Sequence, residues 1–433
     1  MLLLAVAVGI WQYYMRRPSV EPASVENMAF PLPEKPSIAV LPFDSIGGDP
    51  EQEYFSDGIS ENIITQLAQI PHLFVISRQS TFTYKGKNVK VKQVAEEMGV
   101  RYILEGSVQS SGERVRVTAQ LIDAVTGRHM WADNYERELK DIFAIQDEIT
   151  HKVVAEIGVK LGEGEMDRFR RQTSPNIEAY KYFMKALSEL RKFTEEGLLK
   201  ARELLEKAIE IDPQYSLGYS VIAWTHALEA AIGYSENPAH SFDEVDQNIN
   251  KALEIDPDNW DVLNLLTYVY MIKGQYDKSI AQGRRAVERS PNISDAHAFL
   301  AFSLVKAGQP EEAITEITTA MRLAPSYPTW FLDCLGQSYF VVGRYEEAIV
   351  VYNKYLEREP PGSDSRGWIT SYFWLAVINS AMGRENQAQV AAKELLKNLP
   401  TFSLKQQAIR LRFQDEALKD RIIHYASKAG LPE

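Results

Sequence analysis

Apolar and polar positions follow one pattern in the first part of the chain and another after residue 177. In the first part, the apolar run Ser37–Phe43 and the segment Leu73–Thr81 predict buried strands, and Val115–Leu121 alternates as a half-buried strand does. Apolar residues at helical spacing predict helices at Ser56–Leu67 and Ile142–Ile157. With two further strands and one short helix, the order is βαβαβββα. This order predicts a mixed sheet with helices packed against it.

From residue 177 onward, short phrases that end in proline recur at regular intervals. They end at Pro213, Pro257, Pro291, Pro325 and Pro360, which lie 44, 34, 34 and 35 residues apart. Each proline follows a second helix that it could not continue. Glycines in register end the first helices, where a left-handed residue is needed: Gly274, Gly308 and Gly343. The period and these residues resemble the tetratricopeptide repeat, a helix–turn–helix unit of about 34 residues.

The resemblance to this family covers residues 177–402 and predicts an all-α solenoid of six repeats. Single repeats cannot bury their apolar faces alone, so stacked neighbours share one core. The second repeat, residues 214–257, is expected to hold ten extra residues near its internal turn. Residues 403–433 are predicted to form capping helices with a polar outer face. By register, the single cysteine, Cys334, lies in a first helix as a small buried residue.

The first helices of repeats three to five are predicted to line a concave groove. Its mixed aromatic and polar lining suits an extended peptide or a helix, so a protein or peptide ligand is the expected partner. The lysine and asparagine set with which some repeats clamp a carboxyl terminus is mostly absent, because Asn264 and Lys306 stand alone. The predicted groove residues are Asp261, Asn264, Tyr268, Asp295, Phe302, Lys306, Trp330, Asp333 and Gln337.

A second resemblance covers the α/β part, residues 37–162. It is carried by the stretches KPSIAVLPFDSIGGDPEQEYFSDGISENIITQLAQIP, VISRQSTFTYKGK, VRYILEGSVQSSGERVRVTAQLIDAVTGRHMWADNYERE and IFAIQDEIT. These look like the TolB amino-terminal-type domain, which stands before tetratricopeptide repeats in many bacterial signalling proteins. The whole arrangement resembles the non-catalytic half of membrane-linked class III adenylate cyclases. That resemblance implies sensing or docking, and no catalytic residues in this half.

The amino terminus suggests a membrane attachment. Residues 1–17 form an apolar stretch that ends in Trp11, Tyr13, Tyr14 and two arginines, like the interfacial belt that closes a membrane helix. A transmembrane or signal-anchor segment is therefore predicted there, with a proline-rich linker over residues 18–36. The expected localisation is a single-pass protein of the bacterial inner membrane. The arginines favour a cytoplasmic soluble part, whereas a larger preceding cytoplasmic domain would make it periplasmic.

Composition and motifs narrow the possible functions. The 433 residues suffice for two or three domains, and the net charge of −12 argues against a nucleic-acid surface. The sequence contains no H-E-x-x-H, C-x-x-C, G-x-S-x-G or G-x-x-x-x-G-K-[ST] motif. We therefore predict no catalytic, metal-binding or cofactor-binding residues.

Taken together, these patterns predict a non-enzymatic, membrane-anchored interaction or sensory scaffold in bacterial signalling. The first alternative is the regulatory half of an adenylate cyclase, whose catalytic domain acts in trans or lies upstream. The second is a membrane-spanning transcriptional regulator without its amino-terminal effector domain.

Overall fold

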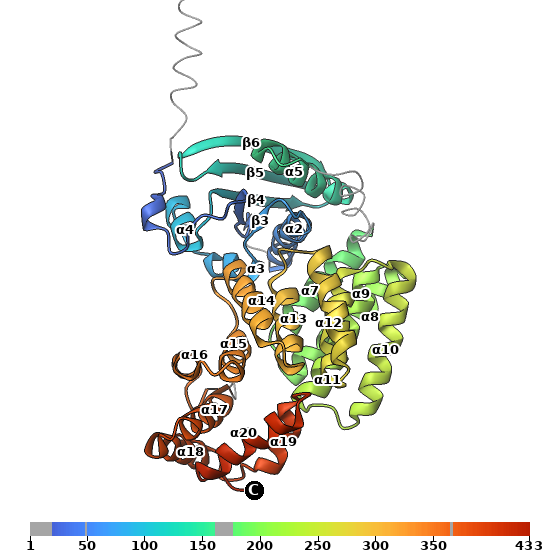
Figure 1. Cartoon of the computed structure of the whole chain (residues 1–433). Coiled ribbons are helices and arrows are strands. Elements are labelled where there is room, and N and C mark those ends of the chain that lie inside the picture. The colour runs from blue at the N-terminus through green and yellow to red at the C-terminus, as the bar shows by residue number, and fades with distance from the viewer. Residues whose placement is uncertain (1–19, 48–49, 161–175, 364–366) are drawn as a thin grey trace, which may run out of the picture. The chain divides into compact units, whose positions relative to one another are not determined.

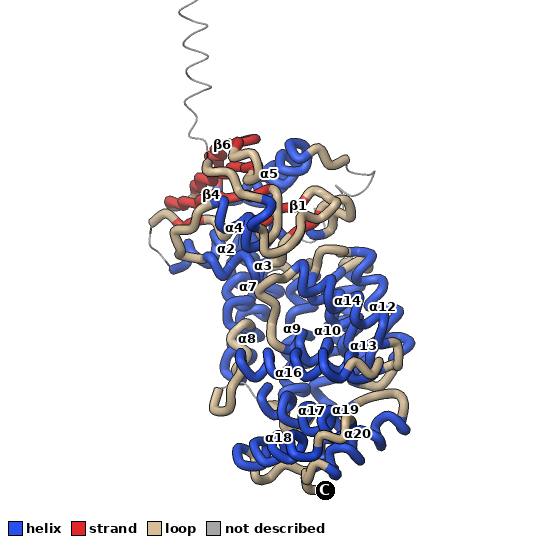
Figure 2. The backbone as a smooth tube through the Cα atoms, turned by 60° about the vertical axis from the view of Figure 1, so that its left-hand side comes forward, coloured by secondary structure: helices blue, strands red, loops and turns tan. Residues whose placement is uncertain are grey.

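The computed structural model describes residues 20–47, 50–160, 176–363 and 367–433. They form two compact units, an α/β unit up to residue 160 and a helical unit from residue 176 onward (Figure 1). All strands of the described chain belong to the first unit, as the red segments of Figure 2 show. The predicted fold class, a mixed-sheet domain followed by helical repeats, is confirmed.

The α/β unit is built on one sheet in the order β3-β1-β4-β5-β6, with β2 beside β4. β1 pairs in parallel with β3 and β4, whereas β4, β5 and β6 pair antiparallel, so the sheet is mixed. In chain order the elements are η1 (Val25–Asn27), β1 (Ser37–Val40), β2 (Asp44–Ser45), α2 (Pro50–Ala68), β3 (Phe74–Val75), α3 (Arg78–Thr81), η2 (Phe82–Tyr84), α4 (Val91–Met98), β4 (Tyr102–Ser111), β5 (Arg114–Asp123), β6 (Arg128–Glu138), η3 (Leu139–Asp141) and α5 (Ile142–Ile157).

The alternation read from the sequence places the core of this unit correctly. In β5, Val115, Val117, Ala119 and Leu121 are buried, and the residues between them are exposed or partly exposed. The predicted strand over Leu73–Thr81 is much shorter than expected. Only two of its residues pair with β1, because the polar residues that follow turn into the short helix α3.

The helical unit consists of six successive helix pairs and two further helices in the described residues. The first helices are α7 (Ile177–Leu190), α9 (Ser216–Ile232), α11 (Trp260–Ile272), α13 (Ser294–Lys306), α15 (Trp330–Val341) and α17 (Gly367–Ala381). Their partners are α8 (Glu195–Ile211), α10 (Pro238–Ile255), α12 (Tyr276–Arg289), α14 (Pro310–Leu323), α16 (Tyr345–Arg358) and α18 (Glu385–Asn398). The carboxyl-terminal helices are α19 (Leu404–Leu411) and α20 (Glu416–Lys428).

Sequence features explain this helical packing. Gly274, Gly308 and Gly343 have φ of 69°, 80° and 80° at the turns inside the pairs, as the register predicted. Small residues also let helices meet closely, since a Cβ on Gly336 would lie 2.6 Å from the ring of Tyr352. Cys334 is fully buried in the same core.

The extra residues of the second pair lengthen its helices. α9 and α10 have 17 and 18 residues, whereas α11 and α12 have 13 and 14. The insertion therefore extends both helices rather than only the loop between them, where the sequence analysis placed it.

The carboxyl-terminal segment, which was predicted to form capping helices with a polar outer face, also contributes apolar residues to the core. Leu411, Phe413, Leu418 and Ile422 are buried in one core cluster with residues of α13, α15 and α17. α20 packs against α17. The segment is therefore an integral part of the core of the later repeats.

The predicted localisation as a single-pass inner-membrane protein is contradicted. None of the helices in the described ranges has both the length and the apolar character that crossing a bilayer requires. The longest of them, α2, has 19 residues but carries Glu53, Asp57 and Glu61. The segment predicted as the anchor, residues 1–17, lies outside the residues that the structure describes.

Candidate functional site

The nine predicted groove residues lie on three neighbouring first helices. Asp261, Asn264 and Tyr268 belong to α11, whereas Asp295, Phe302 and Lys306 belong to α13 and Trp330, Asp333 and Gln337 to α15. α13 contacts both α11 and α15. We call the side of α11, α13 and α15 that carries these residues the A face, and we include in it the side of α9 that carries Trp224.

A row of aromatic rings runs along the A face across four successive repeats. The ring centroid of Trp224 on α9 is 5.8 Å from Tyr268 and 5.6 Å from Phe299. Phe299 is 5.3 Å from Trp330, which is 5.8 Å from Phe302. All five rings are partly exposed. Such spacings are those of favourable aromatic pairs.

Trp224 and Phe299 were missed by the sequence analysis, although signals for both were present. Trp224 precedes Tyr268 by 44 residues, the same interval as between Pro213 and Pro257, so it occupies the same repeat position. Phe299 lies one helical turn after Asp295, on the same side of α13.

Two aspartates lie beside this row without a cationic partner. The indole Nε1 of Trp224 donates a hydrogen bond to Oδ1 of Asp261 at 3.2 Å. Removal from water raises the pKa of Asp261 to about 6, and the pKa of Asp295 to about 6 with a further contribution from the negative charge of Asp261. Within the described chain, no lysine, arginine or histidine forms an ion pair with either carboxylate.

A carboxyl-terminal segment of the chain covers the part of the predicted groove around Lys306. Lys306 Nζ donates to Gln337 Oε1 and, at 2.7 Å, to the carbonyl of Leu411, and it lies 4.0 Å from the ring centroid of Phe413. The backbone N–H of Gln414 donates to the carbonyl of Lys306 at 2.8 Å. We call Leu411–Gln414 the strap.

Burial under the strap changes the chemistry of this end. It lowers the pKa of Lys306 to about 8, and burial likewise raises the pKa of Asp333. Asp333 accepts a hydrogen bond from the hydroxyl of Tyr352 at 3.1 Å. Lys306, Asp333 and Gln337 therefore have internal partners, whereas Asp261 and Asp295 have no ionic partner.

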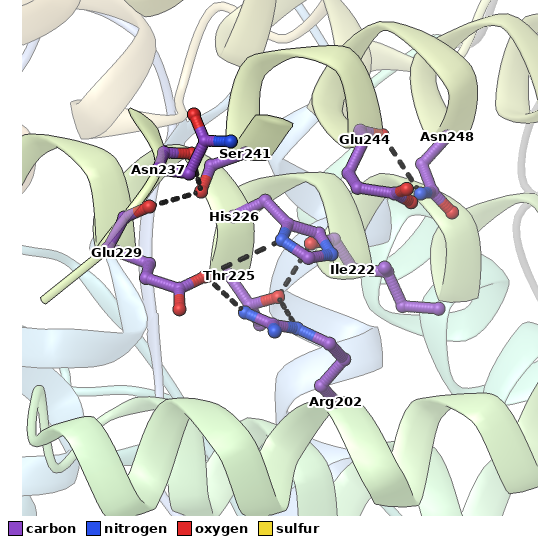
Figure 3. A network of polar contacts seen from close by, with 10 residues as sticks. Arg202, Ile222, Thr225, His226, Glu229, Asn237, Ser241, Glu244 and Asn248 are labelled. Carbon is purple, nitrogen blue, oxygen red and sulfur yellow. Dashed lines mark hydrogen bonds and ion pairs between the residues drawn. The ribbon is translucent and has the colours of Figure 1, made fainter. Parts of the chain in front are cut away.

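A polar cluster links the first two helix pairs (Figure 3). The guanidinium of Arg202 on α8 donates to Glu229 Oε2 at 2.8 Å and to Thr225 Oγ1 at 3.1 Å, both on α9. Nδ1 of His226 lies 3.5 Å from the same Glu229 oxygen. Burial, with the charge of Arg202, lowers the pKa of His226. These contacts tie α8 to α9, and we assign the cluster to repeat packing.

Models of known families match a stretch in each of the two units. Residues 34–152 match the family described as HilA/YgeH-like transcriptional regulator, second domain, and residues 248–281 match the tetratricopeptide repeat. The predicted repeats are thus confirmed. The TolB-type resemblance of the α/β unit is not confirmed, because a different family matches it.

Two curated relatives resemble longer stretches. "Putative adenylate cyclase 3" of Rhizobium meliloti is 45% identical over 222 residues, which are 50% of this chain and 38% of that protein. "Transcriptional regulator HilA" of Salmonella typhimurium is 21% identical over 324 residues, 74% of this chain and 57% of the relative. The chain therefore spans between about two fifths and three fifths of the length of these relatives.

Among solved structures, the chain is similar to PilF of Pseudomonas aeruginosa over part of its length. The match has 18% identity and a TM-score of 0.41, and it covers 54% of this chain and 97% of that one. PilW, a type IV pilus biogenesis factor, matches with 18% identity and a TM-score of 0.42.

Proposed function

We propose that the chain binds a partner polypeptide along the A face of its tetratricopeptide repeats. The observation that carries the proposal is the row of partly exposed rings that crosses four successive first helices beside carboxylates without a cationic partner. Tryptophan and tyrosine supply much of the affinity at protein interfaces when a partner covers them. An extended peptide or a helix would cover several of these rings at once.

The proposal concerns the part of the A face from Trp224 to Trp330. The strap contacts Lys306, which in turn donates to Gln337, so a partner would meet Lys306 only if the strap moved away. Phe302 precedes Lys306 by one helical turn, and Tyr268 and Trp330 both pack against Phe299. A partner of a few residues would contact Tyr268 and Trp330 together.

A double variant tests this function. A random 12-residue peptide library would be selected on the full chain, and the selected peptides would be measured on Tyr268→Ala with Trp330→Ala. We expect binding to weaken at least about tenfold, since aromatic hot spots contribute about 1–4 kcal/mol each. Unchanged binding by the double variant would place the site elsewhere.

A matched control removes two rings outside the A face. Phe193 and Tyr234 are 58% and 36% exposed, and Phe193→Ala with Tyr234→Ala should leave peptide binding unchanged. The far-UV circular dichroism of both double variants should match that of the parent chain, which separates loss of binding from loss of helix.

A regulatory role toward an adenylate cyclase is the second candidate. It is favoured by the 45% identity to "Putative adenylate cyclase 3" over half of this chain. In this case the A face would contact a catalytic domain of the cyclase type. Formation of cyclic AMP by the purified full chain alone would overturn the proposal that the chain is not an enzyme.

A role in transcriptional regulation is the third candidate, favoured by the similarity to HilA over 74% of this chain. The net charge of −12 speaks against direct contact with DNA. A gel-shift assay that detects specific DNA binding by the full chain would reverse that judgement.

A further inference from the structure

Asp261 and Asp295 occupy equivalent positions on adjacent helices. They are 34 residues apart, one repeat period, and lie in the first turns of α11 and α13. The charge of Asp261 acts on Asp295, so the two carboxylates are close enough to repel one another. Like charges in such positions are unfavourable unless a cation joins them.

The unsatisfied polar atoms around them are all acceptors. Oδ1 of Asn264 is buried and has no hydrogen-bond partner in the described chain. Oδ2 of Asp261 is buried as well, and besides the Trp224 indole only the Ser220 hydroxyl, among the described residues, acts on this carboxylate as a hydrogen-bond donor. Asn264 is only 4% exposed and lies one helical turn after Asp261, on the same side of α11. A complementary ligand would therefore supply hydrogen-bond donors to these acceptors.

Aromatic rings adjoin the same acceptors. The ring of Trp224 is joined to Asp261 through its Nε1 hydrogen bond and stacks on both Tyr268 and Phe299. The faces of such rings attract cations, and a planar guanidinium can stack on them while its five N–H groups reach carboxylates. The positive charge of the strap's Arg412 already acts on Tyr268, where it opposes the effect of burial on the phenol pKa.

We infer that Asp261, Asp295 and the aromatic rings beside them bind an arginine side chain of the partner polypeptide. This inference rests on the proposed function, because it assigns the chemistry of the partner at that surface. An acidic ligand would be repelled by the two carboxylates. A purely apolar ligand would bury them without donors, which is unfavourable.

The peptide library selection tests the inference on the full chain. Selected peptides should be enriched in arginine relative to the input library. For the tightest peptide, replacement of its arginine by the neutral isostere citrulline should weaken binding about tenfold, in line with a charge-assisted hydrogen-bonded pair.

A double-mutant cycle assigns that effect to the two aspartates. In Asp261→Asn with Asp295→Asn, the citrulline replacement should have almost no further effect, because the charges it pairs with are gone. The control, Asp277→Asn with Asp420→Asn, makes the same change in net charge at exposed positions and should keep the full tenfold effect. Asparagine is isosteric with aspartate, and circular dichroism would confirm that both variants fold.

The outcomes separate the two proposals. Peptides that lose binding on Tyr268→Ala with Trp330→Ala but show no arginine enrichment would overturn the inference and leave the A face as the binding surface. Equal citrulline effects in the parent and the Asp261/Asp295 variant would also overturn it. Peptides that bind the aromatic double variant unchanged would overturn the proposed function itself.

Discussion

Replacing Asp295 with asparagine should stabilise the helical unit at neutral pH. Burial and the neighbouring charge of Asp261 raise the pKa of Asp295 to about 6 from an ordinary value of 3.8. The folded protein therefore binds this proton more tightly than the unfolded chain does. At pH 7.5 Asp295 is ionised in both the folded and the unfolded state. The full free energy that corresponds to the pKa difference between the two states then destabilises the folded protein.

The expected gain in stability follows from the size of the pKa shift of Asp295. About two pKa units correspond to about 3 kcal/mol, and because Asp295 is partly exposed we expect about 1–2 kcal/mol for Asp295→Asn. In a helical unit of this size that gain should raise the melting temperature by about 2–8 °C. As the pH falls through 6 toward 5, the carboxyl group of Asp295 takes up a proton in the folded state and no longer carries an unfavourable charge. The advantage of asparagine should therefore shrink.

Thermal melts followed at 222 nm at pH 7.5 and pH 5.0 measure this difference. Asp277→Asn, at an exposed position of α12, serves as the control and should change the melting temperature by less than about 1 °C. A gain for Asp295→Asn that is absent at pH 7.5, or equally large at pH 5.0, would refute the reasoning that this carboxyl is held ionised without a partner.

Three further predictions concern packing and the strap. Gly336→Ala should destabilise the helical unit by about 1–3 kcal/mol, because its Cβ would meet the Tyr352 ring, and Tyr352→Leu should restore part of the loss in urea unfolding. Phe413→Ala should expose the strap, seen as faster amide exchange at 411–414 and a loss of about 3–4 kcal/mol; unchanged exchange would contradict this. Arg202→Met should raise the pKa of His226 in an NMR titration, since a neighbouring positive charge is removed; a lowered pKa would exclude that cause.

Local features of the sequence were enough to predict the repeats. The spacing of Pro257, Pro291 and Pro325 and the glycines between them fix the helix ends, because both residues act on the backbone at their own position. If the same repeat register had been extended back to the second repeat, it would have identified Trp224 as the counterpart of Tyr268.

Contacts between distant segments could not be predicted in this way. The strap lies in the segment that was expected to cap the repeats with a polar outer face, and the sequence did not indicate that Leu411 and Phe413 would be buried against a helix more than 100 residues earlier. Sequence polarity alone does not reveal such a partner. Likewise, the apolar pattern of the α/β unit predicted five of its strands, one of them too long, but neither β2 nor the position of β1 between β3 and β4.

The strap has a consequence for cooperativity. In an array where each repeat touches only its neighbours, fraying can begin at either end and stop anywhere. Here the hydroxyl of Tyr276 donates to the carbonyl of Arg412, 136 residues later, and Lys306 reaches Leu411 across 105 residues. These bonds tie the last segment to the third and fourth repeats. We therefore expect the helices between these contacts to unfold together, rather than one helix pair at a time from the end of the array.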